Sequence, residues 1–164
     1  MKFNQLLLKV DDIAPNFSFT DHSGNVKSLH ELDGKKLVFF FPKAFTAGCT
    51  KQSCSLQENY VDLKTKGVSE VIGISLDNQE TLAKFAARYN LQYQLISDRD
   101  GRISKDYGVY RRKLFWKFAD RDTFIIGEDN KILEVLKNGL RGTKSRLGLK
   151  NHGREVMESL DNLS

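Results

Sequence analysis

Proline is scarce in this sequence, and tracts of glycine or serine are absent. Only two of the 164 residues are proline, Pro15 and Pro42. Flexible linkers and low-complexity tails are rich in these residue types, so the composition excludes separate units joined by such linkers. A length of 164 residues is enough to bury one substantial hydrophobic core. We therefore expect a single domain over residues 1–164.

Long apolar runs are also missing. Residues 1–12 contain only a short leucine run before Lys9, whereas a secretory signal needs roughly 7–15 apolar residues after a basic start. No segment approaches the ~18 apolar residues of a membrane-spanning helix. The sequence thus predicts a cytoplasmic protein without a membrane partner. Thiols are kept reduced in that compartment, so the two cysteines are expected to be catalytic or metal-binding rather than a permanent disulfide.

Acidic residues are outnumbered, since 26 lysines and arginines stand against 21 aspartates and glutamates, for a net charge of +5. The excess lies mainly in 111–117 and 137–154. Phe115, Trp116 and Phe118 are interleaved with the first basic stretch, a combination that can stack nucleobases and pair with phosphates. Charge runs more often face water, so we interpret 111–117 as a solvated loop and expect no nucleic-acid partner.

Hydrophobic periodicity predicts alternating strands and helices. Two short apolar runs, Lys36–Phe41 and Val71–Leu76, are typical of strands buried on both faces. The other expected elements are an N-terminal β-hairpin over 16–28, a helix that starts after Gly48 and is closed by Gly67, helices over 78–90, 103–107 and 147–160, and strands over 93–97, 123–126 and 131–136. This order predicts an α/β fold with a central mixed β-sheet flanked by helices.

Cys49 stands at the expected start of the helix that follows the Lys36–Phe41 strand. A residue in the first helical turn faces free backbone N–H groups and the positive end of the helix dipole, which favour a thiolate. The other interpretation is that Cys49, which aligns with Leu56 and Tyr60 along the helix, is a small buried hydrophobe. The position alone leaves both interpretations open.

Cys54 lies five residues after Cys49. In an intact helix, a rise of ~1.5 Å and a turn of ~100° per residue separate the two Cα atoms by roughly 8–9 Å, whereas a disulfide needs less than about 7 Å. If the two cysteines pair, the first turns of the helix must therefore unwind. Cys54 aligns mostly with polar residues, so a surface position without a role is the other interpretation.

The spacing C-x-x-x-x-C also bears on other chemistry. It differs from the C-x-x-C of thioredoxin-type proteins, which weakens an interpretation as a general disulfide exchanger. A structural zinc site takes four ligands, and His22, His30 and His152 lie far apart in sequence without a ligand motif. We expect no metal and no cofactor.

Pro42, Thr46 and Cys49 form the pattern P-x-x-x-T-x-x-C, which resembles that of the peroxiredoxins. With Cys54 added, the chain is similar to the bacterioferritin comigratory protein subfamily, also called peroxiredoxin Q. The likeness continues in order along the chain, in 14–17, 36–41, 71–77, 97–107, 121–126 and 151–152. It implies a thioredoxin-like fold and a peroxidase activity.

The resemblance also implies a role for each matching residue. Cys49 is expected to be the peroxidatic cysteine, whose thiolate attacks the O–O bond and becomes a sulfenic acid. Thr46 is expected to orient peroxide and thiolate by donating or accepting through its hydroxyl, and Arg121 to hold the thiolate and donate to the peroxide oxygens. Pro42 is expected to shield the pocket from water. Cys54 is expected to be the resolving cysteine, which forms an intramolecular disulfide with Cys49.

The implied substrates are hydrogen peroxide and organic hydroperoxides, and the implied reductant of the Cys49–Cys54 disulfide is thioredoxin or a similar dithiol. Ala44 and Phe45 are expected to make the pocket rim apolar and to shift the preference toward bulkier organic hydroperoxides. We expect a monomer. The alternative function is a thiol redox sensor or disulfide exchanger that uses the same cysteines without efficient peroxidase turnover.

Overall fold

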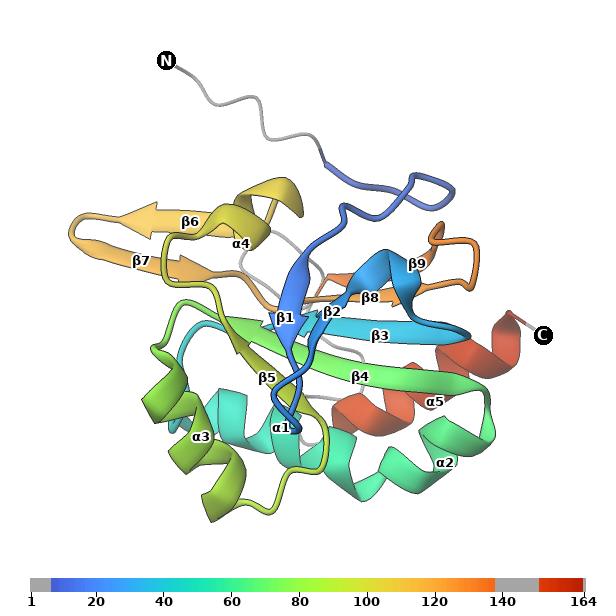
Figure 1. Cartoon of the computed structure of the whole chain (residues 1–164), viewed down its shortest axis with the longest axis horizontal. Coiled ribbons are helices and arrows are strands. Elements are labelled where there is room, and N and C mark those ends of the chain that lie inside the picture. The colour runs from blue at the N-terminus through green and yellow to red at the C-terminus, as the bar shows by residue number, and fades with distance from the viewer. Residues whose placement is uncertain (1–6, 138–150, 164) are drawn as a thin grey trace.

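The computed structural model describes residues 7–137 and 151–163. Their centre is a five-stranded sheet of order β5-β4-β3-β8-β9 (Figure 1). Its strands are β3 (Lys35–Phe40), β4 (Val68–Ser75), β5 (Gln94–Ser97), β8 (Asp122–Ile126) and β9 (Ile132–Lys137). Two hairpins lie outside it, made of β1 (Ser18–Thr20) with β2 (Val26–Ser28), and of β6 (Tyr110–Lys113) with β7 (Trp116–Ala119). The helices are the short 3-10 helix η1 (Leu29–Glu31), α1 (Ala47–Glu58), α2 (Tyr60–Thr65), α3 (Gln79–Arg88), α4 (Arg102–Asp106) and α5 (His152–Asn162).

β3 lies in the middle of the sheet because its side chains are apolar on both faces. It runs parallel to β4 and antiparallel to β8. Leu37, Phe39 and Phe41 belong to one buried cluster, and Val38 and Phe40 belong to the other. This alternation is the two-residue period of a strand, and it lets one short segment bury apolar surface in two cores. The strand predicted over Lys36–Phe41 is confirmed.

Two layers cover the sheet. The helices α1, α2, α3 and α5 lie along one face (Figure 1), where Leu56 of α1, Phe85 of α3 and Val156 of α5 join the same buried cluster. On the other face, Phe19 of β1 and Tyr107 after α4 belong to the second cluster. The predicted α/β fold, with a mixed sheet and an N-terminal hairpin, is confirmed. Within the two described ranges, no helix is long and apolar enough to cross a membrane.

Two predicted helices differ from the observed ones at their ends. The helix expected between Gly48 and Gly67 is two helices, α1 and α2, which meet at Asn59. The Asn59 side chain donates to the Ser55 carbonyl at 2.9 Å, and such local bonds compete with the regular helical pattern. The last helix was predicted from Leu147; positions 147–150 lie outside the described residues, and the helix is described from His152.

The basic stretch predicted as a solvated loop is instead the β6–β7 hairpin. Its strands pair from Tyr110 opposite Ala119 to Lys113 opposite Trp116. The prediction of a loop was wrong, since Phe118 is buried near the base of the hairpin and the Trp116 ring stacks on it with centroids 4.4 Å apart. Residues 112–117 are exposed, so the stretch is solvated as predicted. Arg111 and Lys113 pair with Phe118 and Trp116 across the hairpin. Their long charged side chains made the sequence of this stretch resemble a solvated run of charge.

Candidate active site

Cys49 lies in the first turn of α1, just beyond the end of β3. The Phe41 N–H still donates to the Ile74 carbonyl of β4 at 3.1 Å, and residues 42–46 then lead into α1. The Cys49 side chain is fully buried. Thr46 is the N-cap residue, yet its side chain makes no capping hydrogen bond, and the first turn carries no acidic residue. The positive end of the helix dipole is therefore left to an anionic group at this position.

The loop between β3 and α1 is held from two sides. The Ala44 N–H donates to Asp77 Oδ2 at 2.8 Å, and Ser75 Oγ donates to the same oxygen at 2.8 Å. Phe45 has a φ of +64°, which is rare for an aromatic residue, and its ring packs 5.2 Å from that of Phe85. Phe45 is 49% exposed and Ala44 only 3%. Phe45 is thus placed to contribute apolar surface at this loop, as expected, whereas the buried Ala44 offers almost none.

The hydroxyl of Thr46 already donates a hydrogen bond within the loop. Its Oγ1 donates to the Lys43 carbonyl at 2.8 Å. A hydroxyl that has donated its proton keeps lone pairs that accept hydrogen bonds. In this rotamer the Thr46 hydroxyl therefore has its lone pairs, and not its proton, to offer to a further partner. Pro42, which has no N–H to offer, is partly exposed in the same loop.

Arg121 brings a cation to Cys49 from a distant part of the sequence. Its Nη1 lies 3.2 Å from Cys49 Sγ and 3.5 Å from Gln52 Oε1. Because β8 runs antiparallel to β3, with Thr123 opposite Phe39, the residue just before β8 falls beside the end of β3, where α1 begins. A guanidinium stays charged and donates in a fixed fork. The contact therefore places a permanent cation directly beside the Cys49 sulfur.

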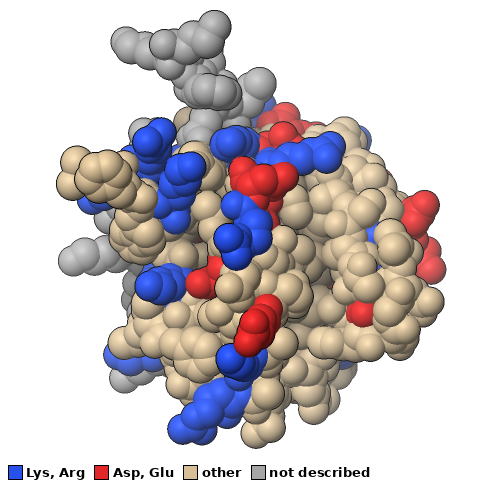
Figure 2. Space-filling model, turned by 60° about the vertical axis from the view of Figure 1, so that its left-hand side comes forward, with Lys and Arg blue, Asp and Glu red and all other residues tan. Residues whose placement is uncertain are grey.

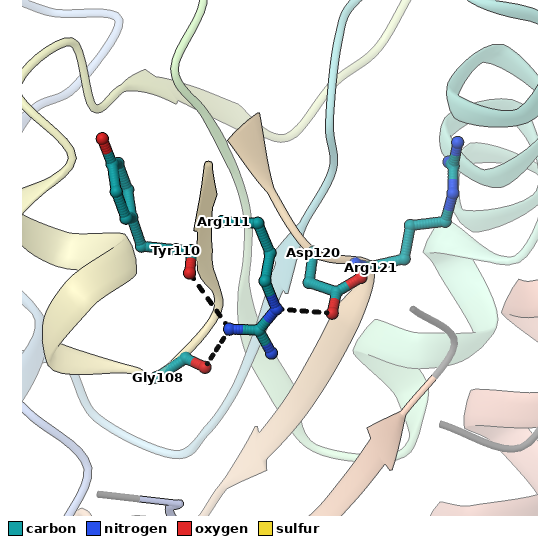
Figure 3. A network of polar contacts seen from close by, with 5 residues as sticks. All are labelled: Gly108, Tyr110, Arg111, Asp120 and Arg121. Carbon is teal, nitrogen blue, oxygen red and sulfur yellow. Dashed lines mark hydrogen bonds and ion pairs between the residues drawn. The ribbon is translucent and has the colours of Figure 1, made fainter. Parts of the chain in front are cut away.

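A polar network behind Arg121 ties it to the base of the β6–β7 hairpin (Figure 3). Asp120 accepts the backbone N–H of Arg121 through Oδ1 at 3.2 Å, and its Oδ2 lies 3.3 Å from Arg111 Nε. Arg111 Nη1 donates to the carbonyls of Gly108 and Tyr110 at 3.2 and 3.0 Å. The Arg121 side chain extends away from this network, toward α1. Sequence reasoning missed Asp120 and Arg111, since their spacing matches no motif.

His152, at the start of α5, contacts β8, the strand that directly follows Arg121. It is fully buried, and its Nε2 lies 2.9 Å from Thr123 Oγ1 in β8. Burial and, secondly, the charge of Arg121 lower the pKa of His152 to about 4. The imidazole is therefore neutral at pH 7, and it adds no second cation beside the arginine. The sequence pointed to this residue only as part of the resemblance, without a role.

Residues 10–135 match the AhpC/TSA family. The chain is a peroxiredoxin of this family. It is 41% identical to Peroxiredoxin Bcp of Escherichia coli over 133 residues, which are 78% of this chain and 85% of the relative. It is 32% identical to the chloroplastic Peroxiredoxin Q of Triticum aestivum over 152 residues, 92% of this chain and 66% of the relative. The crystal structure of peroxidoxin BcpB from Mycobacterium tuberculosis shares its fold with a TM-score of 0.81, at 29% identity, and covers 96% of this chain and 99% of the other.

These likenesses confirm the thioredoxin-like fold and the subfamily expected from the sequence. They make this peroxiredoxin a peroxidase, an oxidoreductase with a peroxide substrate and a thioredoxin-like reductant.

In this peroxiredoxin, α1 is an intact helix that includes both cysteines, and both are free thiols. Cys54 is partly exposed, and burial and, secondly, the negative charge of Glu58 raise its pKa. Its neutral thiol is thus favoured while the helix is intact. Helical geometry separates the Cα atoms of Cys49 and Cys54 by roughly 8–9 Å, so the structure is that of the wound, reduced state.

The start of α5 fastens α1 just beyond Cys54. The Gly153 N–H donates to Ser55 Oγ at 2.9 Å. A Cβ on Gly153 would lie 2.4 Å from the Ser55 carbonyl oxygen and 2.5 Å from Asn59 Nδ2, so only glycine allows this approach. This contact between Gly153 and Ser55, called the clamp below, holds α1 from Ser55 onward. The turns from Cys49 to Cys54 precede the clamp.

Proposed function

We propose that this peroxiredoxin reduces hydrogen peroxide and organic hydroperoxides through a sulfenic acid on Cys49. The Cys49 thiolate attacks the terminal oxygen of ROOH, the new S–O bond replaces the O–O bond, and the alkoxide leaves and takes up a proton to give ROH. Arg121 donates to the peroxide oxygens as charge moves onto the leaving one. Thr46 accepts the hydrogen bond of the peroxide O–H, and Pro42 limits the access of water.

The second half of the proposed cycle returns Cys49 to its thiol. After the first turns of α1 unwind, the Cys54 sulfur attacks the sulfenic sulfur, and one water is released as the Cys49–Cys54 disulfide forms. Unwinding also takes Cys54 away from the burial and from the Glu58 charge that raise its pKa. A dithiol of the thioredoxin type then reduces the disulfide and is itself oxidised. We propose that a monomer performs the whole cycle, in the cytoplasm.

The contact between Arg121 Nη1 and Cys49 Sγ, 3.2 Å long at the start of α1, is the observation that supports this proposal most directly. A cysteine that served only as a small core residue would not need a cation there, because withdrawing a guanidinium even partly from water is costly without an anionic partner. The contact between Gly153 and Ser55 supports the second half, because it leaves the Cys49–Cys54 turns outside the clamped part of α1.

Mass spectrometry after one equivalent of hydrogen peroxide tests both halves. The parent protein should lose two hydrogens as an internal disulfide, whereas Cys54→Ser should gain one oxygen on Cys49. Cys49→Ser should be unchanged, and Ser53→Ala serves as a control beside Cys54.

If the parent forms intermolecular disulfides and no internal one, Cys54 is not the resolving cysteine, whereas the assignment of Cys49 as the peroxidatic cysteine still holds. Stopped-flow oxidation of Cys49 no faster than that of a free thiolate would contradict the peroxidase cycle itself and favour a redox sensor.

A further inference from the structure

The tip of the β6–β7 hairpin exposes three consecutive large apolar residues. Leu114, Phe115 and Trp116 are 88%, 99% and 50% exposed. Lys113 pairs with Trp116, so the turn has only two residues, and Leu114 occupies it with a φ of +51°. Turns of this kind favour glycine, asparagine or aspartate at a positive φ. A leucine there strains the backbone and presents its side chain to solvent, which indicates that the side chain itself has a use.

Basic residues follow directly behind this tip. Arg112, Lys113 and Lys117 are exposed, and no acidic residue lies between 110 and 119. Figure 2 turns the hairpin side of the molecule forward. Lysine and arginine side chains gather in the upper part of that face, with some acidic side chains between them, and a few more lie at its lower edge. The protruding end of the molecule is thus apolar at its extremity and positively charged around it.

The side chains are arranged in layers along the hairpin. Leu114 and Phe115 form the extremity, and Trp116 is one residue back, stacked on the buried Phe118 and thereby fixed to the core. The three basic residues occupy positions at the same level as Trp116 or nearer the core. A bilayer surface has the same order of layers, because acyl chains lie beneath a headgroup level that suits tryptophan and anionic phosphates that attract lysine and arginine.

We propose that the β6–β7 hairpin docks this protein onto bilayers that contain anionic lipids, with Leu114 and Phe115 inserted among the lipids and Arg112, Lys113 and Lys117 on the headgroups. A convex tip fits a deformable surface, whereas a protein partner would need a matching apolar hollow. An aliphatic residue at the extremity also favours lipid over nucleobases, which bind by stacking on aromatic faces. This inference replaces the expectation of no membrane partner, and it is independent of the peroxidase cycle.

The docked orientation would bring the active site near the lipid surface. The base of the hairpin contacts the site through Arg111 and Asp120, whose backbone neighbour is Arg121. At ~3.3 Å per residue the tip stands roughly 10 Å beyond Arg111 along the strand. When the protein is bound through this tip, Cys49 therefore lies in the part of the molecule from which the hairpin projects toward the bilayer.

The single tryptophan of the chain, Trp116, is a direct reporter of docking. On addition of phosphatidylcholine vesicles that contain phosphatidylglycerol, its emission should shift to the blue, and brominated acyl chains should quench it. Vesicles of phosphatidylcholine alone should bind at least tenfold more weakly, since each basic residue near an anionic surface strengthens binding about fivefold. Added salt should weaken binding because it screens these charges.

Two variants separate the roles of the tip and of the charges. Leu114→Asn/Phe115→Ser should lower the partition coefficient at least tenfold, and asparagine accepts the positive φ of the turn, so the fold is kept. Lys113→Glu/Lys117→Glu should lower it by a similar factor. Lys84→Glu/Arg88→Glu on α3 makes the same change in net charge and should leave most of the binding in place. Peroxide reduction in solution should be unchanged in the tip variant, which shows that the protein is folded.

Three outcomes would overturn the proposal. The first is no binding of the parent to anionic vesicles at low salt. The second is equal loss of binding in the α3 control, which would mean that only the net charge matters. The third is vesicle binding that survives the tip variant, together with tight binding of a single-stranded oligonucleotide that quenches Trp116, which would make the hairpin a nucleic-acid surface.

Discussion

Arg121 Nη1 lies 3.2 Å from Cys49 Sγ although the two residues are 72 positions apart in the chain. The antiparallel register of β8 against β3 creates this contact, because it places the start of one strand beside the end of the other. Gln52 shares the same guanidinium nitrogen, at 3.5 Å. The arginine is thus held between α1 and β8.

Replacement of Arg121 by methionine should lower kcat/KM for hydrogen peroxide by about 10²–10³-fold, the usual effect of removing one preorganised donor to developing charge. The kcat/KM of Arg121→Lys should lie between those of the parent and of Arg121→Met, because lysine keeps the positive charge but lacks the forked N–H donors of the guanidinium. Stopped-flow oxidation of Cys49 is the measurement, and Arg99→Met, at an exposed turn position, is the control. A rate within twofold of the parent in Arg121→Met would mean that the contact has no catalytic value.

Phe45→Asn should change substrate preference. Asparagine tolerates the positive φ of this position, so the loss of ring packing against Phe85 is partly offset by relief of backbone strain. We expect kcat/KM for cumene hydroperoxide to fall about tenfold, in line with one lost apolar contact, with little change for hydrogen peroxide. Val61→Asn, an exposed apolar position on α2, should affect neither substrate. Equal losses for both substrates would show that Phe45 shapes the loop rather than the substrate site.

Gly153→Ala should push α5 away from α1. The added Cβ meets the Ser55 carbonyl at 2.4 Å, and overpacking of this kind costs about 1–3 kcal/mol of unfolding free energy. Because the contact holds Ser55, the residue next to Cys54, loosening it should let unwinding extend past Cys54. Disulfide formation after peroxide addition should then become faster while Cys49 oxidation is unchanged.

Rapid quench followed by mass spectrometry resolves these two steps. Ser55→Ala removes only the hydrogen bond to Gly153 and should show a smaller effect in the same direction. Slower disulfide formation in Gly153→Ala would mean that the clamp assists unwinding instead of limiting it.

His152 should make the protein less stable in acid. Its folded pKa of about 4 lies below the ordinary 6.5, so the unfolded chain binds more protons between these values, and this part of the stability is lost as pH falls through them. A difference of this size is worth roughly 3 kcal/mol at most. Asp122 acts in the opposite sense: burial and, secondly, Asp120 raise its pKa to about 6, so its contribution falls as pH rises from 3.8 to about 6.

His152→Gln keeps a partner for Thr123 and removes the titration. Urea unfolding should show the variant gaining stability relative to the parent as pH falls from about 6.5 to about 4, the range set by the His152 pKa. His22→Gln, at an exposed position, should follow the parent curve. A constant difference between His152→Gln and the parent across this range would show that His152 does not titrate as inferred.

Local patterns in the sequence were enough for most of the fold. The two buried strands, the N-terminal hairpin and the α3 helix follow from apolar runs, turn residues and periodicity. The break at Asn59 was missed because it is confined to one residue, whose side chain bonds to the Ser55 carbonyl and leaves no mark on the periodicity. The β6–β7 hairpin was missed because its stability depends on Phe118 reaching a core formed by residues far away in the chain.

The sequence by itself determined that Cys49 follows a buried strand at the start of a helix, and that Cys54 is too far along that helix to pair with it while the helix is wound. Both statements depend on neighbours within a few residues, whose geometry is set by the backbone. Only the tertiary structure decided which arginine faces the thiol, that the Thr46 hydroxyl donates to the Lys43 carbonyl, that Ala44 is buried and that α5 contacts α1 at Ser55. These depend on strand register and helix packing, which bring together residues that no local pattern connects.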